Sequence, residues 1–208
     1  MRLDSAGWPF IGGALVTAAV SGAAITWPLA IPFVLLAAFF AFFFRDPART
    51  SPRGDDLVLS PADGRVLVSG TAASGAAPPG DWQQISIFLS PMDVHINRIP
   101  ASGRVTRVVY TPGRFLPAYR HDAATVNERS EIWIDHHGQS VVARQIVGLL
   151  ARRVVCRTRE GADVRAGDRF GVMKFGSRMD IFLPLSATIR VEVGQMVRGG
   201  ETVIAVLN

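Results

Sequence analysis

The longest apolar stretch of the chain lies near its N-terminus. No charged residue occurs from position 8 to position 44, a length that exceeds a core helix of a soluble domain and indicates a membrane segment. Trp27-Pro28 and Pro32 interrupt the stretch near its middle, where proline commonly ends or begins a helix. The pattern predicts a helical hairpin with segments at 9–26 and 29–44; a single tilted span and a re-entrant pair are the alternatives.

Beyond residue 50 the apolar pattern changes to short runs separated by Gly, Pro and Asp. The runs either alternate with polar residues or stay apolar for four to eight positions, as half-buried and central strands do. No helical period of any length occurs there, so this part of the chain is predicted to be mainly β. The predicted strands cover residues 58–60, 64–69, 84–89, 103–110, 131–135, 140–146, 154–159, 170–175 and 179–185.

The C-terminal stretch, residues 187–208, has the cadence of a particular kind of β fold. Strand-like positions are punctuated by Val193-Gly194 and by Val197-Arg198-Gly199-Gly200-Glu201. This arrangement is typical of small β-sandwiches of the lipoyl and biotinyl carrier type, although the lysine-bearing turn of the carriers is absent. We therefore expect a small β-sandwich or barrel-sandwich-like domain at 49–208, preceded by a helical membrane anchor at 1–48.

The positive charge of the chain bears on the class of partner that it binds. The formal net charge is +5, and arginine carries it almost alone, since Lys174 is the single lysine. Arg2 precedes the apolar segment and Arg45, Arg49 and Arg53 follow it, which favours a hairpin with both ends on the cytoplasmic side. No arginine–aromatic pattern of a nucleic-acid reader is present, so we expect anionic lipid and not nucleic acid as the partner.

Gly176-Ser177 is the first candidate for chemistry, because it separates two strand-like apolar runs. The simplest interpretation of such a pair is a tight turn or a β-bulge. A serine in this position can also attack the carbonyl group of the preceding glycine. That reaction needs a base and a stabilised oxyanion, as other acyl transfers do.

Two further segments supply residue types that this reaction needs. Asp63 lies in Ser60-Pro61-Ala62-Asp63-Gly64, which by itself is a turn ahead of a strand. His95 follows a predicted strand and has Asp93, Asn97 and Arg98 as polar neighbours; a lone histidine is more often structural than catalytic. Serine, histidine and aspartate are the types of a nucleophile, its base and the group that orients the base.

These segments together resemble the phosphatidylserine decarboxylase family in its short, membrane-anchored bacterial form. The resemblance runs from Phe44-Arg45-Asp46-Pro47 through the segments of Asp63, His95 and Asn127-Glu128-Arg129 to Phe175-Gly176-Ser177 and the C-terminus. Longer members of the family have Leu-Gly-Ser-Thr where this chain has Phe-Gly-Ser-Arg. They also have a second histidine where this chain has Arg98.

The resemblance implies a proenzyme that cuts itself between Gly176 and Ser177. The products would be a β chain of residues 1–176 and an α chain of residues 177–208, which stay together as a heterodimer. Ser177 would become a covalent pyruvoyl group, the one cofactor expected, with His95 as the base and Asp63 as its partner. Candidate substrate-binding residues are Arg98, Asn127 and Glu128.

The implied activity is pyruvoyl-dependent decarboxylation of phosphatidylserine to phosphatidylethanolamine and CO2 at the cytoplasmic face of the cell membrane. Two alternatives are a decarboxylase of archaetidylserine and a non-catalytic, membrane-anchored, carrier-like adaptor. The adaptor explains the anchor and the C-terminal cadence, but not the joint occurrence of Asp63, His95 and Gly176-Ser177.

A further homo-oligomer is compatible with the sequence. No metal site is expected, since His136-His137 beside Gly138 reads as a hairpin tip without further ligands at fitting spacing.

Overall fold

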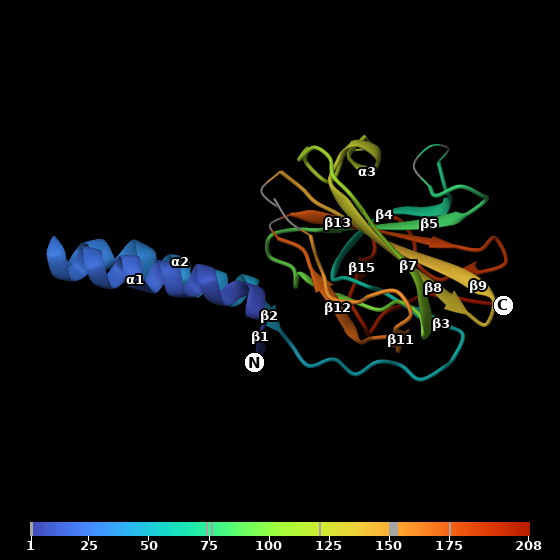
Figure 1. The fold of residues 1–208 in the computed structure, drawn as a ribbon, viewed down its shortest axis with the longest axis horizontal. Coiled ribbons are helices and arrows are strands. Elements are labelled where there is room, and N and C mark those ends of the chain that lie inside the picture. Colours follow the sequence, from blue (N-terminus) through green and yellow to red (C-terminus); the bar gives the residue numbers. More distant parts are fainter. Residues whose placement is uncertain (1, 74, 76, 121, 150–153, 175) are drawn as a thin grey trace. The chain divides into compact units, whose positions relative to one another are not determined.

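The computed structural model describes residues 2–208 except 74, 76, 121, 150–153 and 175. The chain forms two compact units, Met1–Ala48 and Arg49–Asn208. Figure 1 shows a pair of helices in the first unit and a set of curled, closely packed strands in the second.

The first unit is a helical hairpin. Asp4 accepts a hydrogen bond from the N–H of Ala6 (2.9 Å) and starts η1 (Ser5–Gly7), which leads into α1 (Trp8–Ala24). The chain turns through η2 (Trp27–Leu29), and α2 (Ala30–Phe43) returns along α1. Pro32 sits in the first turn of α2, where its missing N–H would have no helical acceptor. The strands β1 (Arg2–Leu3) and β2 (Arg45–Asp46) pair and hold the two ends of the hairpin together.

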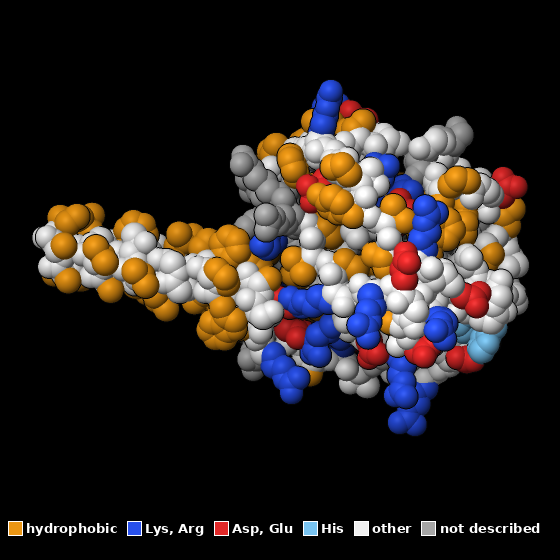
Figure 2. Space-filling model, viewed as in Figure 1, with side chains coloured by type: hydrophobic (Ala, Val, Ile, Leu, Met, Phe, Trp, Pro, Cys, Tyr) orange, Lys and Arg blue, Asp and Glu red, His pale blue; other side chains and the backbone are white. Residues whose placement is uncertain are grey.

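Apolar side chains cover much of the face of this hairpin that Figure 2 shows (orange). The helical stretch Ser5–Ala24 is long and apolar enough to cross a membrane, whereas Trp27–Phe43 is apolar but shorter. Large side chains such as Val16, Trp27 and Leu35 are more than half exposed. A helix that is apolar all round belongs in a protein core or in lipid, so this surface supports membrane association of the unit.

An eight-stranded antiparallel sheet forms the centre of the second unit, with the order β11-β7-β8-β9-β13-β5-β4-β15. Two three-stranded sheets, β10-β12-β6 and β14-β16-β3, complete the unit, and α3 (Ala123–Val126) is the one helix in its described part. The expectation of a mainly β, sandwich-like fold is confirmed. The strands are β3 (Leu57–Leu59), β4 (Gly64–Thr71), β5 (Gln83–Leu89), β6 (Ile96–Arg98), β7 (Gly103–Thr111), β8 (Arg129–His136), β9 (Gln139–Ile146), β10 (Val155–Cys156), β11 (Asp163–Val164), β12 (Arg169–Val172), β13 (Ser177–Leu183), β14 (Thr188–Ile189), β15 (Met196–Val197) and β16 (Val203–Val206).

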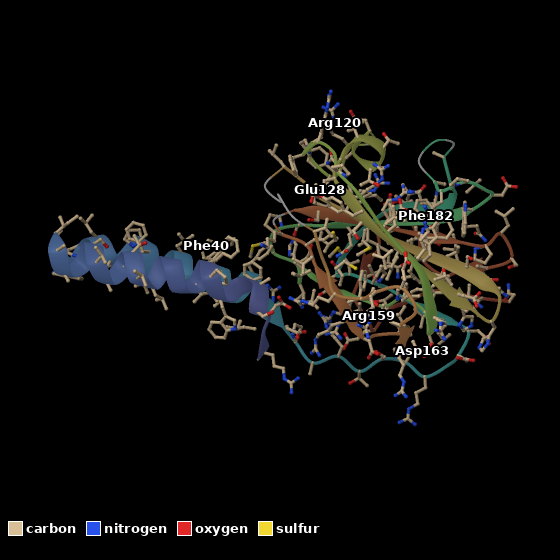
Figure 3. All side chains as sticks on the ribbon, in the orientation of Figure 1. Phe40, Arg120, Glu128, Arg159, Asp163 and Phe182 are labelled. Atoms are coloured by element: carbon tan, nitrogen blue, oxygen red, sulfur yellow. The ribbon has the colours of Figure 1, made fainter. Side chains whose placement is uncertain are left out.

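Strand β13 is buried on both faces. Successive side chains of a strand point to opposite faces, and Met179, Ile181 and Leu183 face the hydrophobic core. Arg178 and Asp180 alternate with them and are also buried; they form an ion pair of 2.6 Å between Nε and Oδ1. Phe182 lies on this second face under the guanidinium of Arg144 (Figure 3). One face of the strand is therefore apolar, and the other buries a charged pair whose two members neutralise each other.

Most strand boundaries differ from the sequence-based expectation by one to a few residues, and two of the differences lie near the site. The strand predicted at 154–159 shortens to Val155–Cys156, which pairs with Val172 and Gly171 of β12. The strand predicted from residue 179 already begins at Ser177, because Ser177 and Arg178 continue the ladder opposite Leu89 and Phe88 of β5. Phe175, at the end of the other predicted strand, lies outside the described residues.

Candidate active site

Gly176 and Ser177 lie where the chain enters β13. Gly176 has φ = +71°, a left-handed conformation that glycine adopts without steric cost. Ser177 is fully buried, and its hydroxyl donates to the carbonyl oxygen of Lys174 at 3.4 Å. Its side chain points to the core side of the sheet, since Met179 and Ile181 follow it at every second position.

His95 lies directly against this segment. Its side chain is fully buried, and its Nδ1 is 2.9 Å from the carbonyl oxygen of Asp93, so Nδ1 carries the proton and donates it. Its Nε2 accepts a hydrogen bond from the N–H of Gly176 at 3.4 Å. The ring therefore presents an unprotonated nitrogen to the Gly176-Ser177 segment, which is the state that a general base needs.

A local turn fixes the histidine. The carboxylate of Asp93 accepts a hydrogen bond from the N–H of Ser90 (2.8 Å), while the N–H of Asp93 donates to the carbonyl of Ser90 (2.9 Å). Pro91 occupies the second position of this turn, where its fixed φ is favourable. The sequence Ser-Pro-Met-Asp thus forms a rigid turn that places the carbonyl of Asp93 under the imidazole.

The carbonyl group of Gly176 lies against Gly148, which the sequence did not single out. A Cβ atom at position 148 would overlap the carbonyl oxygen of Gly176, so only glycine fits there without displacement. Gly148 follows β9, the strand that neighbours β13 in the sheet. No motif surrounds this glycine, and its closeness to Gly176 depends on strand pairing.

Asn127 holds the backbone that leads to Gly148. Its side-chain amide donates to the carbonyls of Leu116 (2.8 Å) and Val147 (2.9 Å) and accepts from the N–H of Leu116 (3.0 Å). Glu128 is buried close to the end of α3 (Figure 3), and its carbonyl accepts from the N–H of Val147 (3.1 Å). The polar loop therefore acts on the structure through backbone contacts, and a role of its side chains in substrate binding stays a prediction.

Asp63 makes its hydrogen bonds away from His95 Nδ1. Its carboxylate accepts from the N–H of Gly199 (2.7 Å) and from the guanidinium of Arg49 (2.6 Å), which also pairs with Glu201 (3.0 Å). Burial opposes the charge of Arg49, but the two carboxylates outweigh it and raise the pKa of Arg49. The acceptor for His95 Nδ1 is the carbonyl of Asp93 and not Asp63. The contacts of Asp63 hold the C-terminal segment in place, and its catalytic role stays a prediction.

Arg98 points to the other side of β6. Its guanidinium donates to the carbonyl of Gly167 (2.9 Å), and its Cδ leaves no room for a side chain at Gly200. His95 and Arg98 are three positions apart, so an extended strand directs them to opposite faces. The structure thus brings together His95, Gly176 and Ser177, and it separates Arg98 from them.

Residues 36–205 of the chain match the phosphatidylserine decarboxylase family. The chain belongs to this family. It is 44% identical over 197 residues to the phosphatidylserine decarboxylase proenzyme of Pelodictyon phaeoclathratiforme, and the match covers 92% of each chain. The proenzymes of the same name from Ehrlichia chaffeensis and Ehrlichia ruminantium are 43% and 44% identical, with 89% of this chain and 83% of each relative covered.

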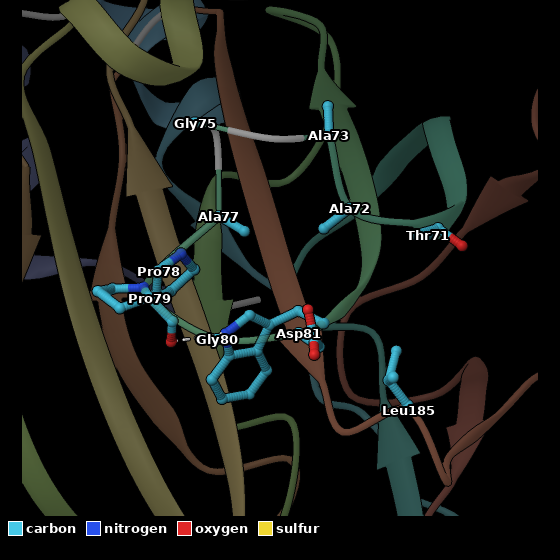
Figure 4. Close-up of a pocket in the computed structure, with 11 residues that line it drawn as sticks. Thr71, Ala72, Ala73, Gly75, Ala77, Pro78, Pro79, Gly80, Asp81 and Leu185 are labelled. Atoms are coloured by element: carbon cyan, nitrogen blue, oxygen red, sulfur yellow. Dashed lines mark hydrogen bonds between the residues drawn. The ribbon is translucent and has the colours of Figure 1, made fainter.

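A cavity of about 530 Å³ lies away from the residues just described. The chain between β4 and β5 lines it, together with Leu185 (Figure 4). Trp82 also lines the cavity, and its indole N–H donates to the carbonyl of Pro79 at 3.2 Å. None of its lining residues belongs to the site, whereas Ser177 and His95 have no exposed surface. In this decarboxylase Ser177 and His95 are therefore closed from solvent.

One group of side chains in the described part of the chain has ligand atoms close enough for a metal ion. Asp55, His136 and His137 each offer one such atom, all within 4.8 Å of one another. His137 and Gly138 form the two-residue tip of the β8–β9 hairpin, both with positive φ, as a type I′ turn requires. The Nε2 of His137 is 2.9 Å from Asp55 Oδ2, a contact that a simple ion pair also makes. The sequence could not indicate this group, because Asp55 is remote along the chain.

The fit of Gly148 against Gly176 generates a first prediction. Gly148→Ala places a methyl group against the carbonyl that Ser177 would attack, and a displacement of about 1 Å at a reacting centre costs roughly 100-fold in rate. We expect slower cleavage at Gly176-Ser177 in a protein that still folds, with a somewhat lower thermal unfolding temperature because the added carbon overlaps backbone atoms. A denaturing gel over time measures the cleavage. The control is Gly12→Ala, where the added carbon meets nothing within 4 Å; cleavage of Gly148→Ala at the control rate would contradict the account.

The contacts of Asp63 generate a second prediction, which compares Asp63→Asn with Arg49→Gln. If Asp63 only holds the C-terminal segment in place, both variants break the same ion pair. We then expect similar, small losses of cleavage rate and similar decreases in unfolding temperature. Replacing the orienting aspartate of a serine-protease triad by asparagine costs about 10⁴-fold in rate. A loss of that order in Asp63→Asn alone would instead identify Asp63 as the orienter of His95.

Proposed function

We propose that this protein is a membrane-anchored proenzyme that cuts itself between Gly176 and Ser177 and then decarboxylates phosphatidylserine through a pyruvoyl group. The observation that carries the proposal is the position of His95, whose unprotonated Nε2 faces the N–H of Gly176 in a buried site. Membership of the phosphatidylserine decarboxylase family supports the reaction and the substrate.

Self-cleavage needs only residues of this chain. His95 Nε2 takes the proton of the Ser177 hydroxyl, and Oγ attacks the carbonyl carbon of Gly176. The peptide C–N bond breaks as the C–O bond forms, which converts the amide to an ester and frees the Ser177 amine. Loss of the Ser177 α-proton and of the Gly176 carboxylate then leaves dehydroalanine, which water hydrolyses to the pyruvoyl group and ammonia.

The residues present fit a pyruvoyl group at position 177. Ser177 is fixed by its pairing with Leu89, it follows a glycine with positive φ, and a nitrogen base lies at its N-terminal side. The pyruvoyl group supplies a carbonyl that takes up the electron pair left when CO2 departs. His95, held by the Asp93 carbonyl, is the group in place to return a proton to the substrate carbon.

Strand pairing keeps the two products of cleavage together in this proposal. Residues Ser177–Leu183 pair with β5 along their whole length, and Arg178–Phe182 pair with β9. Both partner strands belong to the β chain of residues 1–176. Farther along the α chain, β15 pairs with β4 and β16 pairs with β3. A cut at Gly176-Ser177 therefore breaks the chain without removing these ladders, and the mature form is a heterodimer.

The hairpin is the membrane anchor in this proposal. Pairing of β1 with β2 brings both ends of the hairpin to the same place, so both emerge on one side of the bilayer. Arg2 and Arg45 stand at these ends, and their positive charge supports a cytoplasmic location for that side. Archaetidylserine, which has the same serine head group, is the alternative substrate, and assays with both lipids decide between them.

Cleavage is the first test of the proposal. The mature protein should consist of two species, residues 1–176 and residues 177–208 with a blocked N-terminus, as measured by intact mass. Ser177→Ala should remain a single chain without decarboxylase activity, because alanine offers no nucleophile. His95→Ala should cleave more slowly than the parent. An uncut protein that still decarboxylates phosphatidylserine would rule out the pyruvoyl mechanism.

Removal of residues 1–48 tests the anchor. The truncated protein should still cut itself, because the cleaving residues all lie in Arg49–Asn208. We expect activity on liposomal phosphatidylserine to fall by at least about 10-fold, since the anchor raises the local concentration of bilayer substrate. Activity on short-chain, soluble phosphatidylserine should stay near the full-length value. Equal losses on both substrates would show that the hairpin supports the fold of the second unit and does not serve access to lipid.

A further inference from the structure

Two buried amides lie beside the reactive segment with half of their hydrogen-bonding groups unused. Asn97 and Gln145 are both fully buried, and Gln145 Nε2 donates to Asn97 Oδ1 at 2.8 Å. Asn97 Nδ2 and Gln145 Oε1 have no hydrogen-bond partner among the described residues. An unpaired buried amide group is unfavourable, so one donor and one acceptor next to each other indicate a place that a ligand completes.

Strand geometry places both amides on the face of Ser177 and His95. Asn97 lies in β6, two residues after His95. The carbonyl of His95 accepts from the N–H of Met173 and so continues the pairing of β6 with β12 by one residue. Alternate residues of an extended chain share a face. Gln145 pairs directly with Met179 of β13, and Ser177 precedes Met179 by two positions. Diagonal neighbours of this kind on adjacent strands have side chains about 7 Å apart. The two catalytic candidates and the two amides therefore border the same part of the interior.

The facing strand leaves room for the amide of Gln145. Gly171 of β12 lies opposite it, and a Cβ atom there would be only 2.7 Å from Gln145 Nε2. The same Nε2 also approaches the carbonyl of Val155 at 3.4 Å, which fixes the orientation of the amide. With Nε2 directed at two acceptors, Gln145 Oε1 is the atom left for a donor from outside the chain.

We propose that Asn97 and Gln145 form a subsite for the amino and carboxylate groups of the serine head group. Asn97 Nδ2 donates a hydrogen bond to the carboxylate, and Gln145 Oε1 accepts one from the amine. A carboxylate needs a hydrogen-bond donor, and an ammonium group needs an acceptor. The free donor of Asn97 and the free acceptor of Gln145 therefore match the two groups of an amino acid. The subsite rests on the proposed function and specifies how its substrate is held.

This assignment gives the two amides different consequences. The carboxylate leaves as CO2, so only the substrate uses the contact with Asn97. The amine is present in substrate and product, so both use the contact with Gln145. A hydrogen bond to a charged group that is lost on substitution weakens binding by about 10- to 100-fold.

The test is calorimetric binding of three soluble, short-chain lipids to the mature protein. Their head groups are 3-hydroxypropionate with only the carboxylate, ethanolamine with only the amine, and propanol with neither. The wild type should bind the first two at least about 10-fold more tightly than the third. Asn97→Asp, which keeps the acceptor for Gln145 and loses the donor, should remove the preference for the carboxylate and leave that for the amine. Gln145→Met should remove the preference for the amine.

Controls separate this subsite from general damage. Gln139→Met makes the same change on the same face of β9, six residues away, and should bind all three lipids as the wild type does. Intact mass confirms cleavage of each variant. If Asn97→Asp folds but stays uncut, Asn97 serves maturation and the subsite is wrong. If the wild type binds the carboxylate lipid no better than the propanol lipid, the subsite is wrong whatever the variants do.

The same samples distinguish this inference from the proposed function. Turnover of short-chain phosphatidylserine by the wild type tests the function without reference to the amides. If the wild type turns over phosphatidylserine and Asn97→Asp does so with the same activity, the subsite is overturned and the proposed function stands. Head-group preferences as expected without turnover of phosphatidylserine would overturn the proposed function and keep a site for amino and carboxylate groups.

Discussion

The ladder of hydrogen bonds on both sides of β13 is the constraint on which the candidate site depends. It fixes Ser177 opposite Leu89 and holds the following residues between β5 and β9. The residue before Ser177 is a glycine with positive φ, outside the ladder. The bond proposed for cleavage thus joins a residue that the sheet holds rigidly to one that it does not hold. After a cut the new N-terminus would keep its place, while the end of the β chain would be free to move.

Burial gives this arrangement its second property. Ser177 and His95 have no exposed surface, and Gly148 lies directly against the carbonyl of Gly176. A buried site excludes water during an acyl shift, which favours attack by the serine over hydrolysis. It would also keep lipid away from the site before the proposed cleavage. In the proposed function, the event that makes the cofactor is therefore also the event that lets the β-chain end move away from the site.

Electrostatic contacts join the two ends of the second unit, Arg49–Asn208. Arg49 pairs with Asp63 and Glu201, and Asp63 also binds the backbone N–H of Gly199. Gly199 and Glu201 belong to the proposed α chain and Arg49 and Asp63 to the β chain, so these bonds cross the cut. Desolvation opposes the charge of Glu201, but hydrogen bonds from Arg49 and from the N–H of Thr50 outweigh it and lower the pKa of Glu201. The contact with Glu201 thus stabilises the fold above the ordinary glutamate pKa and is lost on acidification below it.

The sequence by itself determined the features that depend on residues close together along the chain. An uncharged stretch broken by proline predicted the hairpin helices, and short apolar runs predicted the β fold. The contexts of Ser177 and His95 predicted a catalytic pair, which stays a prediction; the structure places His95 against Gly176, the residue before Ser177. Only the tertiary structure brought Gly148 to the carbonyl of Gly176 and Gln145 to Asn97. These contacts join strands that are distant in the sequence, and their register depends on hydrogen bonds between backbones that carry no sequence motif. The engagement of Asp63 by Arg49 was hidden for the same reason, because a residue type in a motif does not specify which partner reaches it in space.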